Sequence, residues 1–193
     1  GESPDNPMPP PLLVTDGEWT ASCFGITDGG WLAMAPGAAY GPAKQWPADL
    51  FRQVAETWID RGGRVVVLGS RSDAGPAQTI ANGLLGALDL CGKTSLPEAM
   101  AILQQTDMCL SNDSGLMHLA AAVGVPGVAV FGSTNPRATG PLGARWIVLW
   151  EPPECAPCFE RICTLPEQDY RCLRAIPPET VVRALDQLSA SSA

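Results

Sequence analysis

A chain of 193 residues is long enough for one domain with its own core, and a content of 46% apolar and 17% charged residues is typical of globular proteins. The formal net charge of −8, without a cluster of lysines or arginines, argues against nucleic acid as a partner. Because no apolar run approaches the ~20 residues of a membrane span and no signal peptide begins the chain, we expect a cytoplasmic protein without a transmembrane segment.

The composition divides the chain into three parts. Five prolines among the first 11 residues favour extended backbone, so residues 1–28 are assigned to a proline-rich linker and the approach to the domain. Such a linker is unexpected at the start of a chain, which suggests that another domain preceded it. Residues 29–188 form the expected domain, and residues 189–193 are a small, polar tail.

Short apolar runs alternate with helical patterns along the domain. The runs at 65–68 and 128–131 are continuously apolar, which indicates strands that are covered on both faces, as in a parallel sheet. The sequence predicts six strands: 31–35, 64–69, 88–91, 107–111, 127–132 and 145–150.

Apolar residues at helical spacing predict four helices. The first covers 50–59 and stops at Gly62 and Gly63, and Ser95 with Glu98 predicts a capping box before the second. The helices lie at 50–59, 96–103, 114–123 and 178–188. Strands and helices in alternation, joined by short loops, predict an α/β domain with a doubly wound, Rossmann-like parallel sheet.

Ligands of such sheets bind beyond the carboxyl ends of the strands. Four loops should meet there, at 36–44, 70–73, 112–115 and 133–136. They are rich in Gly, Ser, Thr, Asn and Asp, which suits a phosphorylated ligand. Lys44 is either a solvated surface charge or the counter-charge of a diphosphate.

The stretch "SNDSGLMH" (111–118) contains the only histidine of the chain. Asp113 or Ser114 is expected to cap the following helix, and Gly115 would let an anion approach the free N–H groups of its first turn. His118, four residues after Ser114, could hydrogen-bond a phosphate or sugar oxygen on the same face. The alternative is a capped helix with its histidine in the core.

A serine hydrolase with Ser114, His118 and Asp113 as its triad is a weaker interpretation. Asp113 directly precedes Ser114 in the sequence, so it cannot easily bridge a serine and a histidine that share one helical turn. The G-x-S-x-G nucleophile elbow is also absent from this stretch.

Three blocks carry a resemblance: "APGAAYGPAKQWP" (35–47), "VVVLGS" (65–70) and "NDSGLMHLAAAVGVPGVAVFGSTNP" (112–136). They resemble the ADP-heptose:lipopolysaccharide heptosyltransferases of glycosyltransferase family 9, particularly the heptosyltransferase II type. The resemblance runs from about residue 10 to the final helix and covers the C-terminal half of that family. It implies the donor-binding half of a GT-B glycosyltransferase, which binds ADP-heptose for transfer to the lipopolysaccharide inner core.

The resemblance also implies a set of donor-binding residues. Asp73 would take the ribose hydroxyls, and the 92–94 segment would line the adenine. Gly37 and Ala38 stand where some relatives carry hydroxyl residues, so a side-chain contact from these two positions is not expected. The implied set is Lys44, Asp73, Thr94, Asp113, Ser114, Gly115 and His118.

Catalysis by the family implies a part that this chain lacks. The base is expected to be a carboxylate of an N-terminal, acceptor-binding domain, so no catalytic residue is assigned, and the chain alone should bind ADP-heptose without transferring it. The helix start and Lys44 would stabilise the departing ADP, and no cofactor is expected. No Asp-x-Asp occurs at a strand end, and family members of this kind work without bound Mg²⁺. The lipopolysaccharide acceptor is compatible with a peripheral contact at the inner membrane.

Cys155, Cys158, Cys163 and Cys172 lie within eighteen residues. Their spacing fits zinc, an iron–sulfur centre, disulfides or reduced thiols, and one C-x-x-C with irregular partners does not decide between them. Similar segments occur in some members of the family that the chain resembles, which implies a structural feature without a catalytic role.

Two further functions remain open beside the glycosyltransferase. A sugar-nucleotide epimerase of GT-B shape also carries Asp-Ser-Gly at a helix start, but it would normally use UDP sugars, and the "GPAKQWP" block speaks against it. A non-catalytic module that binds a nucleotide sugar is the other.

Overall fold

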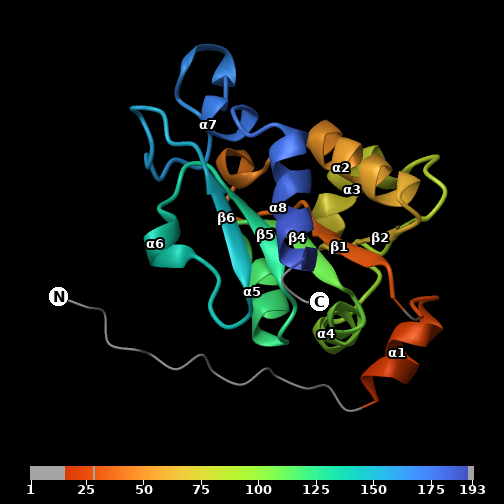
Figure 1. Ribbon diagram of the computed structural model, residues 1–193. Coiled ribbons are helices and arrows are strands. Elements are labelled where there is room, and N and C mark those ends of the chain that lie inside the picture. The colour runs from red at the N-terminus through yellow and green to blue at the C-terminus, as the bar shows by residue number, and fades with distance from the viewer. Residues whose placement is uncertain (1–15, 28, 191–193) are drawn as a thin grey trace.

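A computed structural model describes residues 16–27 and 29–190 and contains one parallel six-stranded sheet (Figure 1). All six predicted strands are confirmed, and each lies within two residues of its predicted bounds. The strands are β1 (Trp31–Ala35), β2 (Arg64–Val67), β3 (Ala87–Asp89), β4 (Met108–Asn112), β5 (Gly127–Phe131) and β6 (Trp146–Trp150).

The four predicted helices are also confirmed, and the described residues contain four more α-helices and three short 3-10 helices that were not predicted. The confirmed helices are α2 (Ala48–Asp60), α4 (Leu96–Gln104), α5 (Gly115–Ala122) and α8 (Pro178–Ala190). The additional α-helices are α1 (Gly17–Cys23), α3 (Ala74–Ala81) and the short α6 (Pro136–Thr139) and α7 (Arg171–Arg174). None of the helices within 16–27 and 29–190 is long and apolar enough to cross a membrane.

The ends of the chain were expected to be a linker and a tail. The prolines of the expected linker and the last three residues of the expected tail lie outside the described residues. Helix α1, which falls in the stretch assigned to the approach to the domain, packs on the body of the protein, with Ala21 fully buried. Ser189 and Ala190 of the expected tail belong to α8.

The strand order β3-β2-β1-β4-β5-β6 is that of a doubly wound Rossmann sheet. Strands β1 and β4 pair in parallel from Leu32 opposite Met108 to Ala35 opposite Ser111. The direction of winding reverses between these two strands, so the loops that follow them diverge and leave a crevice at the carboxyl edge of the sheet.

Both faces of the sheet are covered by helices (Figure 1). Leu32 and Met34 of β1 pack into the core under α2, α3 and α8, whereas Ala33 faces the core under α1, α4 and α5. Valines of β2 alternate in the same way, with Val65 and Val67 on the first side. This two-sided burial explains why these strands have continuously apolar sequences.

The predicted capping box of α4 is present. The N–H of Ser95 donates to Oε2 of Glu98 at 2.7 Å, and the N–H of Glu98 donates to Oγ of Ser95 at 3.4 Å. The hydrogen bonds from Ser95 lower the pKa of Glu98. The box fixes the start of α4 directly after the turn at 92–94.

Candidate functional site

The loop after β1, residues 36–47, is termed the first loop, and a buried asparagine of β4 fixes both of its ends. Asn112 Nδ2 donates to the carbonyl of Pro36 at 2.6 Å, and its Oδ1 accepts from the N–H of Trp46 at 3.0 Å. The indole Nε1 of Trp46 donates to the carbonyl of Ile176 at 3.0 Å. The middle of the first loop is therefore held at the edge of the crevice. Asn112 was not among the residues singled out from the sequence.

Lys44 and Asp113 form an ion pair at this edge. Lys44 Nζ lies 2.6 Å from Oδ2 of Asp113, and the two side chains are only 11% and 4% exposed. The same carboxylate oxygen accepts from Oγ1 of Thr134 at 2.6 Å and from Oγ1 of Thr139 at 3.3 Å. A buried ion pair is stable when further hydrogen bonds offset the free energy that its charged groups lose on leaving water. Asp113 thus positions the ammonium group of Lys44.

The start of α5 is open. Ser114 occupies the N-cap position, but its side chain makes no capping hydrogen bond, and its Oγ lies 3.2 Å from Oγ of Ser111 instead. Asp113 is engaged with Lys44, so the expected side-chain cap is wrong for both candidates. An α-helix leaves its first N–H groups without an intrahelical partner. Apart from its chain neighbours and the helix backbone, nothing in the described structure lies within 4 Å of a Cβ built on Gly115, so this side of the helix start is open. Free N–H groups at an open helix start can bind an anion.

A cleft of about 230 Å³ spans the reversal point of the sheet. Three of the four loops expected at this edge line it, and the loop at 133–136 instead packs against the first loop through the N–H of Ser133, which donates to the carbonyl of Ala43 at 3.2 Å. The cleft is lined by Gly37, Ala38, Ala39, Ser70, Ser72, Asp73, Ser114, Gly115 and Leu116.

Asp73 lies on one wall of this cleft, in the loop after β2. Its Oδ2 accepts from the N–H and from Oγ of Ser70, both at 2.7 Å. A Cβ placed on Gly37 would lie 2.4 Å from Oδ1 of Asp73. The carboxylate therefore occupies the space that a side chain at position 37 would need, so the glycine of this chain and the position of Asp73 depend on each other.

The 92–94 turn lies beside the loop that carries Asp73. The N–H of Gly92 donates to the carbonyl of Gly69 at 2.8 Å, and a Cβ on Gly92 would lie 2.5 Å from the side chain of Arg71. Thr94 is half-buried and is not among the residues that line the cleft.

His118 is exposed on α5, so the alternative that places it in the core is wrong. Its N–H lies 3.5 Å from the carbonyl of Ser114, one turn earlier on the helix. It does not line the cleft.

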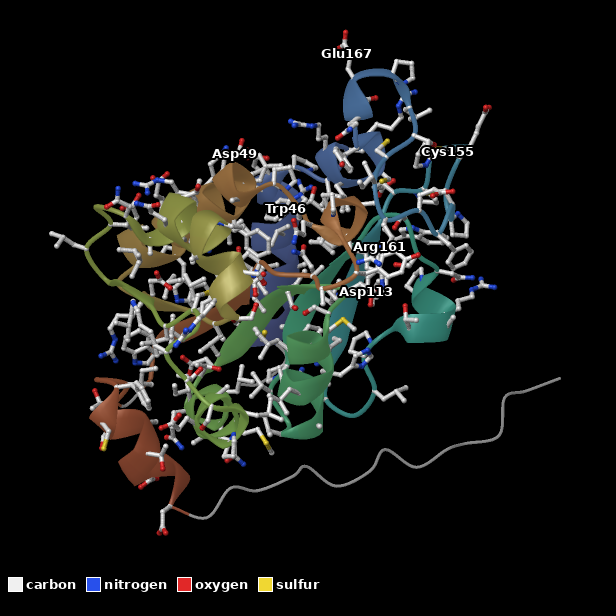
Figure 2. The ribbon with its side chains drawn as sticks, turned by 180° about the vertical axis from the view of Figure 1, so that it is seen from behind. Trp46, Asp49, Asp113, Cys155, Arg161 and Glu167 are labelled. Carbon is white, nitrogen blue, oxygen red and sulfur yellow. The ribbon has the colours of Figure 1, made fainter. Side chains whose placement is uncertain are left out.

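The region 155–172, termed the Cys-rich segment, lies across the first loop, a contact that the sequence did not indicate. The N–H of Ala43 donates to the carbonyl of Arg161 at 3.1 Å, and Nε of Arg161 donates to the carbonyl of Tyr40 at 2.7 Å. The hydroxyl of Tyr40 donates to the carbonyl of Phe159. Arg161 and Asp113, labelled in Figure 2, therefore border the same first loop from two elements far apart in sequence.

The four cysteines of the segment are free thiols. Burial raises the pKa of Cys172 to about 11, and the neighbouring thiols of Cys158, Cys155 and Cys163 add to this shift. Over the described ranges 16–27 and 29–190, no three His, Cys, Asp or Glu side chains are arranged to hold a metal ion.

Comparisons with known proteins agree with the resemblance that the three sequence blocks indicated. The family described as glycosyltransferase family 9 (heptosyltransferase) matches residues 7–168. Lipopolysaccharide heptosyltransferase 2 of Escherichia coli K12 is 36% identical over 160 residues, which are 75% of this chain and 45% of that protein. Lipooligosaccharide heptosyltransferase 2 of Haemophilus influenzae is 37% identical over 123 residues, 61% of this chain and 36% of that protein.

A solved structure of the E. coli ADP-heptose lipopolysaccharide heptosyltransferase II superposes with a TM-score of 0.82 at 29% identity. The match covers 98% of this chain and 56% of that chain. The chain therefore spans about half the length of the relatives that it matches.

Proposed function

The chain belongs to glycosyltransferase family 9, and from this premise we propose that it binds ADP-heptose as the donor part of a heptosyltransferase acting on the lipopolysaccharide inner core. The observation that carries the proposal is the uncapped start of α5 beside Lys44, on the edge of a cleft at the reversal point of the sheet. Backbone N–H groups and a fixed ammonium group at one place suit a diphosphate.

The diphosphate would lie at the start of α5. The N–H groups of Gly115 and Leu116, which line the cleft, would bind its oxygens, and Lys44 would approach from the first loop. Asp113 would act through Lys44, because a carboxylate next to a phosphate would repel it. His118, exposed one turn further along α5, would donate to a phosphate or sugar oxygen at the mouth of the site.

The nucleoside would extend toward β2 and β3. Asp73 on the cleft wall would accept hydrogen bonds from the ribose hydroxyls, as acidic residues do in other Rossmann sheets. The 92–94 turn, with Thr94, lies beside the loop that holds Asp73 and would line the adenine. This orientation leaves the sugar on the side of β4 and β5.

Heptose transfer would break the bond between the sugar and the β-phosphate, with negative charge growing on the departing ADP. The N–H groups at the start of α5 and the ammonium of Lys44, which Asp113 holds in place, would stabilise that charge with little reorganisation. We assign the acceptor and the base that takes the proton of its hydroxyl to the half of the relatives that this chain does not match. Because the acceptor is a membrane lipid, we also propose that the protein acts on the cytoplasmic side, with a peripheral contact at the inner membrane.

Calorimetric titration of ADP-heptose, ADP and UDP-GlcNAc into the protein tests this proposal. ADP-heptose and ADP should bind and UDP-GlcNAc should not. Lys44→Arg should keep part of the affinity, whereas Lys44→Ala should lower it at least about tenfold, the effect of one hydrogen bond to a charged group. Arg61→Ala, which removes a cation from an exposed ion pair with Asp186, serves as the matched control. Selective binding of UDP-GlcNAc would favour the epimerase and contradict the proposal.

A further inference from the structure

Arg161 holds an uncompensated positive charge at the edge of the site. Its side chain is exposed, and its Nε donates to the carbonyl of Tyr40 at 2.7 Å. Within the part of the chain that the structure describes, Arg161 takes part in none of the ion pairs. Its two terminal nitrogens also make no hydrogen bond to a described residue. The guanidinium is therefore oriented by one bond while its fork of donors stays available.

The backbone around Arg161 fixes this cation close to Lys44. The guanidinium carbon lies 5.6 Å from the ring centroid of Tyr40, and Lys44 Nζ lies 4.8 Å from the same centroid. The carbonyl of Arg161 accepts from the N–H of Ala43 at 3.1 Å. A Cβ on Gly41 would lie 2.6 Å from that carbonyl oxygen, so glycine allows the two backbones to meet.

The charges of the site explain why a second cation matters. Lys44 is already paired with Asp113 at 2.6 Å, so this pair adds little net charge for an incoming ligand. The start of α5 contributes the equivalent of about half a positive charge. A diphosphate needs more compensation than that. A guanidinium supplies a full charge, and its geometry matches two phosphate oxygens at once.

The position of Arg161 along the sheet edge indicates which phosphate it would meet. Asp73 and the 92–94 turn follow β2 and β3, on one side of β1. The Cys-rich segment follows β6 on the other side, and the N–H of Phe159 donates to the carbonyl of Ser133, after β5, at 2.8 Å. With the nucleoside at Asp73, Arg161 lies at the end of the ligand that carries the sugar.

We propose that Arg161 binds the β-phosphate of the nucleotide sugar, so that the Cys-rich segment completes the donor site. This inference rests on the proposed function, because it takes the orientation of the ADP-sugar from it. Tyr40 serves as the positioning residue, since its carbonyl orients the guanidinium and its hydroxyl holds the carbonyl of Phe159.

Calorimetry with AMP, ADP and ADP-heptose on wild type, Arg161→Gln, Arg161→Lys and Arg174→Gln tests the inference. Arg174 is an exposed arginine of α7 and serves as the control. Arg161→Gln should lower the affinity for ADP and ADP-heptose about tenfold and leave that for AMP, which lacks the β-phosphate, within about twofold. Arg161→Lys should recover part of the loss, and Arg174→Gln should behave as wild type.

Two results would overturn the inference while leaving the proposed function intact. If Arg161→Gln binds ADP as tightly as wild type does, Arg161 makes no contact with the phosphate. If affinity for AMP and ADP falls equally, Arg161 supports the first loop and does not bind the β-phosphate. Failure of the wild-type protein to bind ADP would instead overturn the proposed function, and this inference with it. Thermal unfolding of each variant confirms that the protein remains folded.

Discussion

The first loop and the Cys-rich segment meet at the edge of the proposed site, but they are held in different ways. Buried side chains fix the first loop, with Asn112 fully buried and Trp46 1% exposed. The part of the Cys-rich segment that contacts it is exposed, and its contacts use the carbonyls of Phe159 and Arg161 together with the exposed side chain of Arg161. The core therefore determines the geometry of the first loop, and the first loop in turn determines that of the segment.

Removing Lys44 should have the largest effect on stability. Lys44→Ala leaves Asp113 buried without its cation, which typically costs about 3–5 kcal/mol of the free energy of unfolding. Urea denaturation measures this loss. The double variant with Asp113→Ala should recover part of it, because no buried charge is left unpaired. Arg61→Ala breaks an exposed ion pair with Asp186 that is worth about 0–1 kcal/mol. If Lys44→Ala is as stable as Arg61→Ala, the pair of Lys44 with Asp113 does not hold the first loop.

Asn112→Ala should have the next largest effect. The substitution leaves the carbonyl of Pro36 and the N–H of Trp46 without partners in the interior, at a cost of about 3 kcal/mol for the two groups. Affinity for ADP should fall as well, because the loop that carries Lys44 is released. Exposed Asn82→Ala is the control and should change the unfolding free energy by less than about 0.5 kcal/mol. Equal stabilities of the two variants would contradict the assignment of Asn112 as the anchor.

Gly41→Ala tests the contact between the two regions. Gly41 has φ of 147°, and an added Cβ would meet the carbonyl oxygen of Arg161 at 2.6 Å. We expect the free energy of unfolding to fall by about 2 kcal/mol and the binding of ADP-heptose to weaken. Gly83→Ala also places an alanine at a positive φ, 71°, but nothing lies within 4 Å of the added Cβ. Gly41→Ala should therefore reduce binding and Gly83→Ala should not, and equal effects on binding would argue against the contact.

Thiol labelling measures the difference in exposure between the Cys-rich segment and the buried core, and it needs no substitution that would change the stability of the protein. Cys155 and Cys158 are exposed, whereas burial raises the pKa of Cys109 to about 12 and that of Cys172 to about 11. Alkylation followed by mass spectrometry at pH 8 should modify the exposed Cys23, Cys155 and Cys158 first. Labelling of Cys172 should increase as the pH approaches 11, because the reactive thiolate then becomes populated. Early labelling of Cys109 would contradict the buried core of β4.

The same thiols determine how stability depends on alkaline pH. Burial raises the pKa of both Cys91 and Cys109 from 9.0 to about 12 in the folded protein. Their contribution to stability is therefore fully present below pH 9 and is lost as the pH rises through 12. Stability that stays constant over this range would indicate that these thiols are hydrated.

Much of the fold could be predicted because it depends on local patterns. Strands β2 and β5 are continuous apolar runs, and Ser95 with Glu98 marked the start of α4. Helix α3 was missed because Gly75 and Pro76 indicate a loop, although proline is tolerated in the first turn of a helix. Helix α1 was missed because it follows the proline-rich stretch.

The candidate site could be predicted only in part. The rule that ligands bind beyond the carboxyl ends of parallel strands predicted that the loops with Asp73, Ser114 and Gly115 meet, and all three residues line one cleft. The rule works here because it depends only on where the strands end. The ion pair of Lys44 with Asp113 and the approach of Arg161 depend on how three loops pack in space, which no local pattern encodes.

The central claim is that the open start of α5 binds the diphosphate, and NMR of the backbone amides tests it most directly. Titration with ADP should shift the amide signals of Gly115 and Leu116 to saturation at the calorimetric affinity, while adenosine leaves them nearly unchanged. The amide of Glu179, at the start of α8, serves as the reference and should not move. Saturating ADP that shifts amides elsewhere and leaves Gly115 and Leu116 in place would contradict the claim.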